Sequence, residues 1–340
     1  MAKAPKKTAA KKAKTTAKKA ASKAVKTTAK KATTQAKKAV AKTAPPKKAK
    51  QKKPATKEGK KVTGYGGGGV DVVMSVDQVA KEAASIAANA PTHKELLKLA
   101  DNDPLLTIED LRAGYGKMEI LHEFTLEIKK GQSLCLIGPN GAGKSTVLHS
   151  IFGFTNIFSG KISISGKDVT NLTPSQKLAE AGIAYILQDK SVFPQMTVEE
   201  NLLMGGFLKN KPLEAKAAAE MVFDKYSRLA ERRDKPAGVL SGGERRLLEI
   251  SRALVMNPEV LLVDEPSIGL EPRFIDMVFE ILADLQHRDG KTIIMVEQNA
   301  KKGLSFADLG YVLVSGETAI ADKGDNLLKN PDVGRLFLGG

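Results

Sequence analysis

The stretch Gly138-Pro139-Asn140-Gly141-Ala142-Gly143-Lys144-Ser145-Thr146 decides the fold of this 340-residue chain. It follows the strand-like run Ser133-Leu134-Cys135-Leu136-Ile137 and precedes apolar residues at helical spacing. The pattern G-x-x-x-x-G-K-[ST] between a strand and a helix predicts a phosphate-binding loop. Its glycines let backbone N–H groups approach phosphate oxygens, and the dipole of the following helix favours their negative charge.

The polar side chains of this loop have predicted tasks. We expect Lys144 to reach the β- and γ-phosphates of a nucleotide and the Ser145 hydroxyl to ligate Mg²⁺. A glycine-rich turn with a surface lysine is the alternative, which the flanking strand and helix disfavour. The predicted nucleotide-binding residues here are Gly138, Pro139, Asn140, Gly141, Ala142, Gly143, Lys144, Ser145 and Thr146.

Two acids follow a second apolar run. Val260-Leu261-Leu262-Val263 leads directly into Asp264 and Glu265. An acid at the carboxyl end of a buried strand can hold hydrated Mg²⁺, and the next acid can polarise the attacking water. We assign Asp264 to the metal and Glu265 to the general base. Alternatively, the two acids only cap a strand. The presence of a phosphate loop in the same chain disfavours this purely structural role.

A third motif, Leu240-Ser241-Gly242-Gly243-Glu244, lies between the other two and opens a helical run. Taken alone, it is also a serine helix cap with a glycine pair. Here the chain resembles the ATP-binding cassette (ABC) family, in which this signature motif closes on ATP held by another subunit. The resemblance implies that Ser241, Gly242 and Gly243 bind the γ-phosphate from a helix amino terminus. It also implies that hydrolysis requires a dimer.

Further positions match the ABC pattern. Tyr115 matches the aromatic residue that stacks on adenine, although a core or surface tyrosine at a strand end is the alternative. Gln188 matches the glutamine that links Mg²⁺ and the attacking water to the membrane partner, and residues 267–270 match the loop that crosses the dimer. Gln298 stands where most cassettes place a histidine; it can form hydrogen bonds but carries no charge. The resemblance thus implies Glu265, Gln188 and Gln298 as catalytic residues, and Ser145, Gln188 and Asp264 as metal ligands.

Four segments resemble the ATP-binding subunits of branched-chain amino acid importers: residues 192–202, 264–270, 296–300 and 337–340. Glu244-Arg245-Arg246 is instead more similar to the lipopolysaccharide-export ATPase, but that exporter generally keeps the histidine replaced here by Gln298. We therefore expect an importer ATPase for branched-chain or related amino acids. The alternatives are a lipopolysaccharide-export or urea/amide transporter ATPase, and a soluble ABC ATPase that acts on nucleic acid.

The predicted fold class is α/β, because short apolar strands alternate with helical segments from Leu105 onward. The resemblance implies the P-loop NTPase fold of ABC nucleotide-binding domains: a RecA-like mixed sheet, an antiparallel β subdomain and a helical signature subdomain at about 197–250. We expect this domain at 105–340. A glycine-rich linker and two short helices, 76–90 and 93–100, would occupy 62–104.

Residues 1–61 form a basic tail with 23 lysines, one acid and a net charge of +22. The other 279 residues carry 31 basic and 37 acidic side chains, a net charge of −6. The tail lacks the apolar surface to offset the entropy of ordering, so we expect it to be disordered when free. Its composition resembles the tails of linker histones. Three roles for the tail are compatible with its sequence. It could bind nucleic acid through phosphate contacts, bind an anionic membrane surface, or serve only as a solvated extension.

The rest of the composition narrows the class of protein. No apolar run approaches the ~20 residues of a membrane span, and the amino terminus lacks the apolar h-region of a secretory signal. A lone cysteine and four scattered histidines argue against a disulfide scaffold or a zinc module. We expect a cytoplasmic protein, peripheral on the inner membrane, with ATP and Mg²⁺ as cofactors. The implied partners are a second ABC ATPase subunit, two permeases and, indirectly, a periplasmic binding protein.

Overall fold

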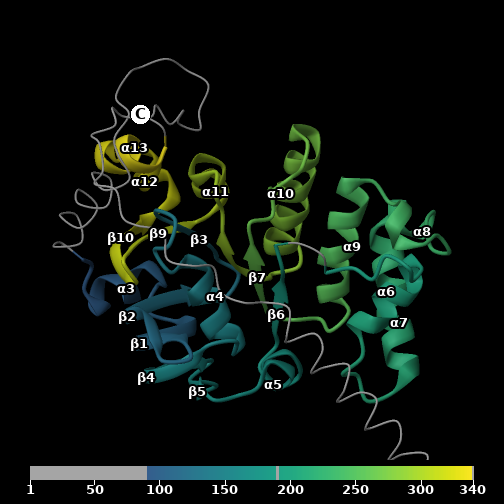
Figure 1. The fold of residues 1–340 in the computed structure, drawn as a ribbon, viewed down its shortest axis with the longest axis horizontal. Helices are drawn as coiled ribbons and strands as arrows, with labels where there is room; N and C mark the ends of the chain where they lie inside the picture. Colours follow the sequence, from purple (N-terminus) through teal and green to yellow (C-terminus); the bar gives the residue numbers. More distant parts are fainter. Residues whose placement is uncertain (1–89, 189–190, 339–340) are drawn as a thin grey trace, which may run out of the picture. The chain divides into compact units, whose positions relative to one another are not determined.

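The computed structural model describes residues 90–188 and 191–338 (Figure 1). The predicted tail, the glycine-rich linker and all but the last residue of the helix expected at 76–90 lie outside the described residues. The second short helix is present as α3 (His93–Leu99). The Glu95 carboxylate accepts a hydrogen bond from the Thr92 N–H at 2.8 Å, which forms a capping box at the start of this helix.

Two sheets form the centre of the described structure. An antiparallel sheet has the order β2 (Met118–Lys129), β1 (Pro104–Tyr115), β4 (Asn156–Ile164) and β5 (Lys167–Asp168). The second sheet has the order β10 (Glu317–Lys323), β9 (Leu309–Val314), β3 (Ser133–Ile137), β8 (Thr292–Val296), β7 (Val260–Asp264) and β6 (Ile183–Ile186). Its strands run parallel except for β10. The carboxyl ends of β3, β6, β7 and β8 therefore meet at one edge.

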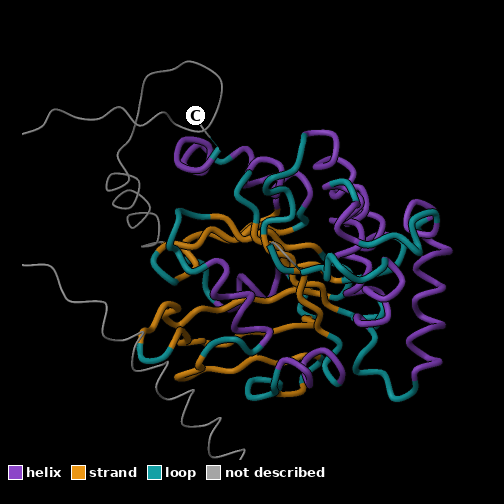
Figure 2. The backbone as a smooth tube through the Cα atoms, turned by 45° about the vertical axis from the view of Figure 1, so that its right-hand side comes forward, coloured by secondary structure: helices purple, strands orange, loops and turns teal. Residues whose placement is uncertain are grey.

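The parallel strands are buried on both faces, which explains their continuous apolar runs. In β3, Leu134 and Leu136 face the core that α4 (Lys144–Phe152) shares with both sheets, while Cys135 and Ile137 face the opposite core. The helices that contribute to that second core include α10 (Pro272–His287), α11 (Ala300–Phe306), α12 (Gly324–Lys329) and α13 (Pro331–Phe337). Figure 2 shows the strands gathered beside this helical layer.

A helical region lies beyond β6, at the right of Figure 1. Its elements are α6 (Val198–Gly205), α7 (Pro212–Lys225), α8 (Ser227–Ala230), the 3₁₀ turn η1 (Ala237–Val239) and α9 (Gly242–Leu254). These elements share a separate apolar core that includes Leu202, Phe223 and Leu248. The short helix α5 (Pro174–Ala179) precedes β6 instead.

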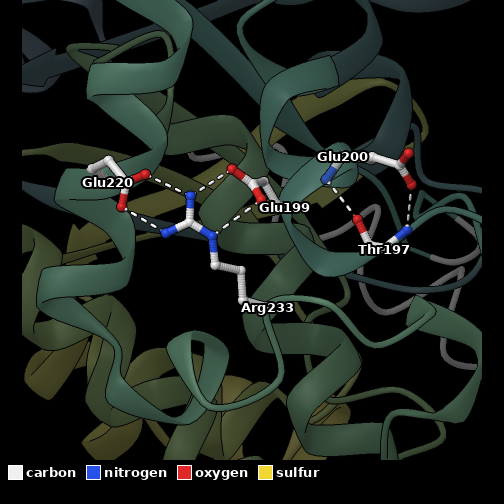
Figure 3. Close-up of polar contacts among 5 residues, drawn as sticks. All are labelled: Thr197, Glu199, Glu200, Glu220 and Arg233. Carbon is white, nitrogen blue, oxygen red and sulfur yellow. Dashed lines mark hydrogen bonds and ion pairs between the residues drawn. The ribbon is translucent and has the colours of Figure 1, made fainter.

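One arginine ties the helical region together (Figure 3). Arg233, in the segment after α8, donates to both carboxylate oxygens of Glu199 on α6 at 3.1 and 2.5 Å. It donates equally to Glu220 on α7, at 2.9 and 2.6 Å. Bidentate pairing of this kind fixes direction as well as distance. Arg233 therefore sets how the segment that leads to α9 lies against α6 and α7.

The predicted fold class is confirmed: a mixed sheet, an antiparallel sheet and a helical region occur in the expected order. β1 begins at Pro104, next to the predicted domain limit, and the helical elements from α6 to α9 span 198–254. The limits of the domains themselves stay predictions. Within the described ranges, no helix has the length and apolar character to cross a membrane.

Candidate active site

The phosphate loop connects β3 to α4, as its sequence pattern predicts. Gly138 has a φ of +146°, and a Cβ atom there would lie 2.2 Å from the carbonyl oxygen of Leu313 on β9. Gly143 caps α4 with a φ of +98°. Both positions exclude larger residues because they combine left-handed backbone with close neighbours. The loop therefore turns tightly, and the first residues of α4, whose N–H groups have no partner within the helix, line a pocket.

Lys144 lies across its own loop. Its Nζ atom donates to the carbonyl oxygens of Gly138 and Pro139, both at 2.9 Å. Burial lowers the pKa of Lys144, while the carboxylates of Glu265 and Asp264 act in the opposite direction. The Lys144 ammonium group is thus hydrogen-bonded to two neutral carbonyl oxygens, which phosphate oxygens can replace. An open pocket of about 390 Å³ surrounds it, lined by Ile120, Asn140, Gly141, Gly143, Lys144, Ser145, Thr146 and Glu265.

Asp264, at the end of β7, accepts hydrogen bonds from two hydroxyl groups. Ser145 Oγ donates to one carboxylate oxygen at 3.3 Å, and the Tyr185 hydroxyl donates to the other at 2.8 Å. Hydroxyl and carboxylate oxygens are ligands that Mg²⁺ prefers, and Mg²⁺ uses few protein ligands when phosphates complete its shell. Ser145 and Asp264 therefore fit the metal role predicted for them. Gln188 would have to add its side-chain carbonyl oxygen, because its NH₂ group is a donor only and donates to Glu265.

Glu265 lies next to the phosphate-loop pocket in a strained conformation. Its φ is +42°, and its N–H donates to the carbonyl oxygen of Val296 at 2.9 Å. Gln188 Nε2 donates to the Glu265 carboxylate at 2.6 Å. Burial is the main cause that raises the pKa of Glu265; Asp264 and Glu297 add to it, whereas Lys144 and Gln188 oppose it. A raised pKa brings a carboxylate closer to the range of an effective general base.

Gln298 follows β8 at the same sheet edge as Glu265. Its side chain is exposed, and β8 pairs with β7 so that Val296 lies opposite Asp264. The preceding residue, Glu297, is only 2% exposed. Its Oε1 accepts from Ser267 Oγ at 2.7 Å and from the Asn299 N–H at 3.0 Å. Glu297 therefore fixes the loop after Glu265 to the end of β8.

Tyr115 ends β1 and is 43% exposed. Its hydroxyl lies 2.5 Å from Nδ1 of His149 on α4, and the two rings meet edge to face. Burial lowers the pKa of His149. The structure thus ties Tyr115 to the helix that follows the phosphate loop while leaving the tyrosine accessible. Its role in stacking on adenine stays a prediction.

The signature motif begins α9, in the helical region. Ser241 Oγ accepts from the Glu244 N–H at 3.3 Å, and the Glu244 carboxylate accepts from the Ser241 N–H at 2.9 Å. A Cβ atom on Gly243 would lie 2.3 Å from Phe274 on α10, so helix packing alone requires this glycine. Ser241 and Gly242 line pockets other than the one around Lys144. Within the described chain, the signature motif does not join the phosphate loop.

The structure thus brings together Lys144, Ser145, Asp264, Glu265 and Gln188, which are 121 residues apart in sequence at the extremes. Sequence reasoning assigned no role to Tyr185 or Glu297. Both stand at the carboxyl ends of buried strands that lead into predicted site residues, and that position is the signal that could have revealed them.

Comparisons with known proteins agree with this geometry. Residues 121–268 match the model of the ABC transporter family. The chain is 42% identical to the high-affinity branched-chain amino acid transport ATP-binding protein BraG of Pseudomonas aeruginosa, over 69% of this chain and 100% of that protein. It is 37% identical to the probable branched-chain amino acid transport ATP-binding protein LivF of Archaeoglobus fulgidus, over 69% and 99%.

Among solved structures, a nucleotide-free ATP-binding cassette from an ABC transporter superimposes with a TM-score of 0.62. It shares 28% sequence identity, and the match covers 70% of this chain and all of that one. The shared sequence, the shared fold and the cluster around Lys144 lead to the same conclusion. The chain belongs to the ABC transporter family and is one of its ATP-binding ATPases.

Proposed function

We propose that this chain is the ATP-hydrolysing subunit of an importer for branched-chain or related amino acids. One observation supports ATP hydrolysis above all. The Glu265 carboxylate lines the same pocket as Lys144 and accepts a hydrogen bond from Gln188 Nε2 at 2.6 Å. The names of the two relatives, both branched-chain amino acid transport ATP-binding proteins, support the choice of solute. The exposed Gln298 in place of a histidine agrees with the same subfamily.

The proposed reaction is hydrolysis of the γ-phosphate of ATP. Lys144 exchanges its two carbonyl partners for phosphate oxygens, and the N–H groups at the start of α4 bind the remaining charge. Glu265 takes a proton from water, whose oxygen attacks the γ-phosphorus as the bond to ADP breaks. Gln188 holds Glu265 in place. Mg²⁺ bound by Ser145 and Asp264 would neutralise charge on the phosphates.

The proposed active unit is a dimer. Ser241 and Gly242 line pockets other than the Lys144 pocket of their own chain, which supports a role for the motif Ser241-Gly242-Gly243 at the site of a second cassette. The amino terminus of α9 would then face the γ-phosphate held by the partner. The partner is either a copy of this chain or a related ATPase.

The helical region is the proposed contact with two membrane permeases. It exposes large apolar side chains at Phe207, Leu213, Met221 and Val239, each at least 66% accessible. Apolar side chains gathered on one region mark a binding surface more often than isolated ones. This contact would hold the chain on the cytoplasmic face of the membrane, with a periplasmic binding protein delivering the solute on the other side.

A second candidate function follows from the +22 charge of residues 1–61. A polycation of this density favours nucleic acid, so a soluble ABC ATPase that acts on DNA or ribosomes is the alternative. The cassette chemistry is the same in both cases. The partner recovered with the protein distinguishes them.

The variant Glu265→Gln tests the proposal. We expect ATP to bind normally, turnover to fall by about 10² to 10³-fold because the base is lost, and a dimer to accumulate with Mg-ATP in size-exclusion chromatography. Glu180→Gln, an exposed site at the end of α5, is the matched control. Unchanged ATPase activity in Glu265→Gln would contradict the assignment. Purified from membranes in this trapped state, the protein should bring two permeases; DNA or ribosomes alone would favour the second candidate.

A further inference from the structure

Arg246, on the second turn of the signature helix α9, is almost completely buried. It is 4% exposed, although it follows the exposed motif Ser241-Gly242 by only a few residues. Its Nη1 atom donates to the backbone carbonyl oxygen of Leu187 at 2.8 Å and to the Glu249 carboxylate, also at 2.8 Å. A guanidinium is costly to bury, so both contacts are needed to hold it there.

The contact with Leu187 anchors a segment that the sheet does not hold. β6 ends at Ile186, and its pairing with β7 stops at the same residue. Leu187 and Gln188 come next, and both are exposed. A charge-assisted hydrogen bond is roughly twice as strong as one between neutral groups. Arg246 thus replaces the missing strand pairing at the point where the chain leaves the sheet.

Gln188 has space around it, so its position depends on this backbone anchor. A pocket of about 470 Å³ opens beside it. The pocket walls are Gln188, Gly242, Arg245, Arg246, Glu249, Ile268, Gly269 and Leu270. Gln188 nonetheless places its amide nitrogen 2.6 Å from Glu265. A side chain that is not packed needs a fixed backbone to keep a short contact.

We propose that Arg246 is a positioning residue that holds Gln188 against Glu265 from the signature helix. The contacts run without a gap from α9 through Arg246 to the Leu187 carbonyl, and from the next residue, Gln188, to Glu265. The inference rests on the proposed function, in which Glu265 is the base. It adds that a displacement of α9 reaches the base of the same subunit through a single side chain.

Two arginines, Arg245 and Arg246, follow the signature motif in the sequence. Glu244-Arg245-Arg246 is the feature that did not fit the amino acid importers, and Glu249 neutralises Arg246 one turn later on the same helix. Arg245, its neighbour, donates to the Leu240 carbonyl before α9, at 3.3 Å, and to no other residue that the structure describes. The two arginines are therefore not equivalent: Arg246 donates to the Leu187 carbonyl next to Gln188, and Arg245 donates to the carbonyl of Leu240.

The test removes the anchor without leaving a buried charge. In Arg246→Met/Glu249→Gln, both charges are lost together. We expect ATP affinity to change by less than about twofold and kcat to fall about tenfold, since Gln188 is no longer fixed. The double variant Lys225→Gln/Asp289→Asn, which removes an ion pair outside the site, is the control and should keep its kcat.

A double-mutant cycle separates positioning from a general loss of packing. Once Gln188→Ala has removed the amide, loss of Arg246 and Glu249 should lower kcat by less than about twofold more, because the two changes act through the same contact. Two independent, multiplying losses would overturn the proposal. So would an unchanged kcat in the Arg246→Met/Glu249→Gln variant while Glu265→Gln is inactive. That last combination would leave the proposed function intact.

A conservative variant keeps the test valid if the double variant does not fold. Arg246→Lys retains the charge beside Glu249, and because Nη1 alone makes both contacts, one amine can replace it. We expect Arg246→Lys to recover kcat to within about threefold of the natural chain. A folded Arg246→Lys with the kcat of Gln188→Ala would count against the proposal.

Discussion

Asp264 illustrates how single contacts tune this site. Its two carboxylate oxygens accept hydrogen bonds from hydroxyl groups on different elements, Ser145 on α4 and Tyr185 on β6. A hydroxyl has one proton to donate and two lone pairs, so Ser145 could ligate Mg²⁺ while it still donates to Asp264. Tyr185 can keep its contact and hold the carboxylate in orientation. The residues around a metal ligand matter almost as much as the ligand itself.

Tyr185→Phe should therefore weaken the use of Mg²⁺ while leaving nucleotide binding intact. We expect the Mg²⁺ concentration for half-maximal ATPase activity to rise about tenfold, because the Asp264 carboxylate loses its orienting donor. ATP binding in EDTA should stay the same. A Mg²⁺ titration of ATPase activity measures the effect.

Tyr226→Phe provides the matched control. The Tyr226 hydroxyl is buried and finds no hydrogen-bond partner among the residues that the structure describes. Its removal should leave the Mg²⁺ titration unchanged. If Tyr185→Phe and Tyr226→Phe gave the same titration as the natural chain, Tyr185 would have no part in the metal site.

At the scale of elements, the helical region depends on the link between α6, α7 and the segment after α8. Arg233 makes this link with two glutamates, and its guanidinium also lies 4.7 Å from the ring of Phe223. Hydrogen bonds to Arg233 are the main cause that lowers the pKa of Glu199 and of Glu220. Without the arginine, two carboxylates would face each other.

Arg233→Gln should destabilise the protein in a way that depends on pH. The two glutamates have lowered pKa values in the folded state, so they add stability above about pH 4.3, their unfolded value, and lose it as the pH falls through the folded values. At pH 7 the variant should melt roughly 2–4 °C lower, and this gap should close below about pH 4.

Thermal melts between pH 3 and 7 test this expectation. Arg288→Gln is the control, because Arg288 is highly exposed and its ion pair in the described structure is with Asp284 of the helix that it follows, at 3.3 Å. That variant should melt close to the natural chain. A gap between Arg233→Gln and the natural chain that stayed constant at all pH values would contradict the role of the glutamates.

Sequence patterns predicted these elements unequally. The short helix α3 could be predicted because helix caps join residues three apart, as Thr92 and Glu95 do. The buried strands β3 and β7 were readable from their apolar runs. Arg233, by contrast, contacts Glu199, which is 34 positions away in the sequence, and Glu220, which is 13 positions away. No local sequence pattern predicts contacts at such separations.

At the scale of the whole molecule, charge divides the chain into two parts with different chemistry. Residues 1–61 carry +22, and the other 279 residues carry −6. The residues assigned above to the ATPase site all lie between Tyr115 and Gln298 in the sequence. The partner of the tail is therefore a separate question from the reaction of the cassette.

A protein that lacks residues 1–61 should keep its ATPase activity and lose salt-sensitive binding to DNA. The expected affinity of the full chain for nonspecific duplex falls steeply with salt, because lysines release counterions from the phosphates. Fluorescence anisotropy with labelled DNA at about 50 to 200 mM salt measures both proteins.

Anionic vesicles are the comparison that identifies the polyanion. Loss of vesicle binding with little DNA binding in either protein would assign the tail to the membrane surface. Equal DNA binding by the full chain and the shortened protein would exclude a role for the tail in binding nucleic acid.

The sequence by itself determined the fold class, the phosphate loop, the acid pair and the family, because each depends on residues that are neighbours in the chain. Only the tertiary structure decided which distant groups meet: Tyr185 with Asp264, Gln188 with Glu265, and Arg246 with the Leu187 carbonyl. These contacts form where the carboxyl ends of parallel strands meet the helical region. Local patterns fix the elements, whereas packing among the elements fixes the distances on which the chemistry depends.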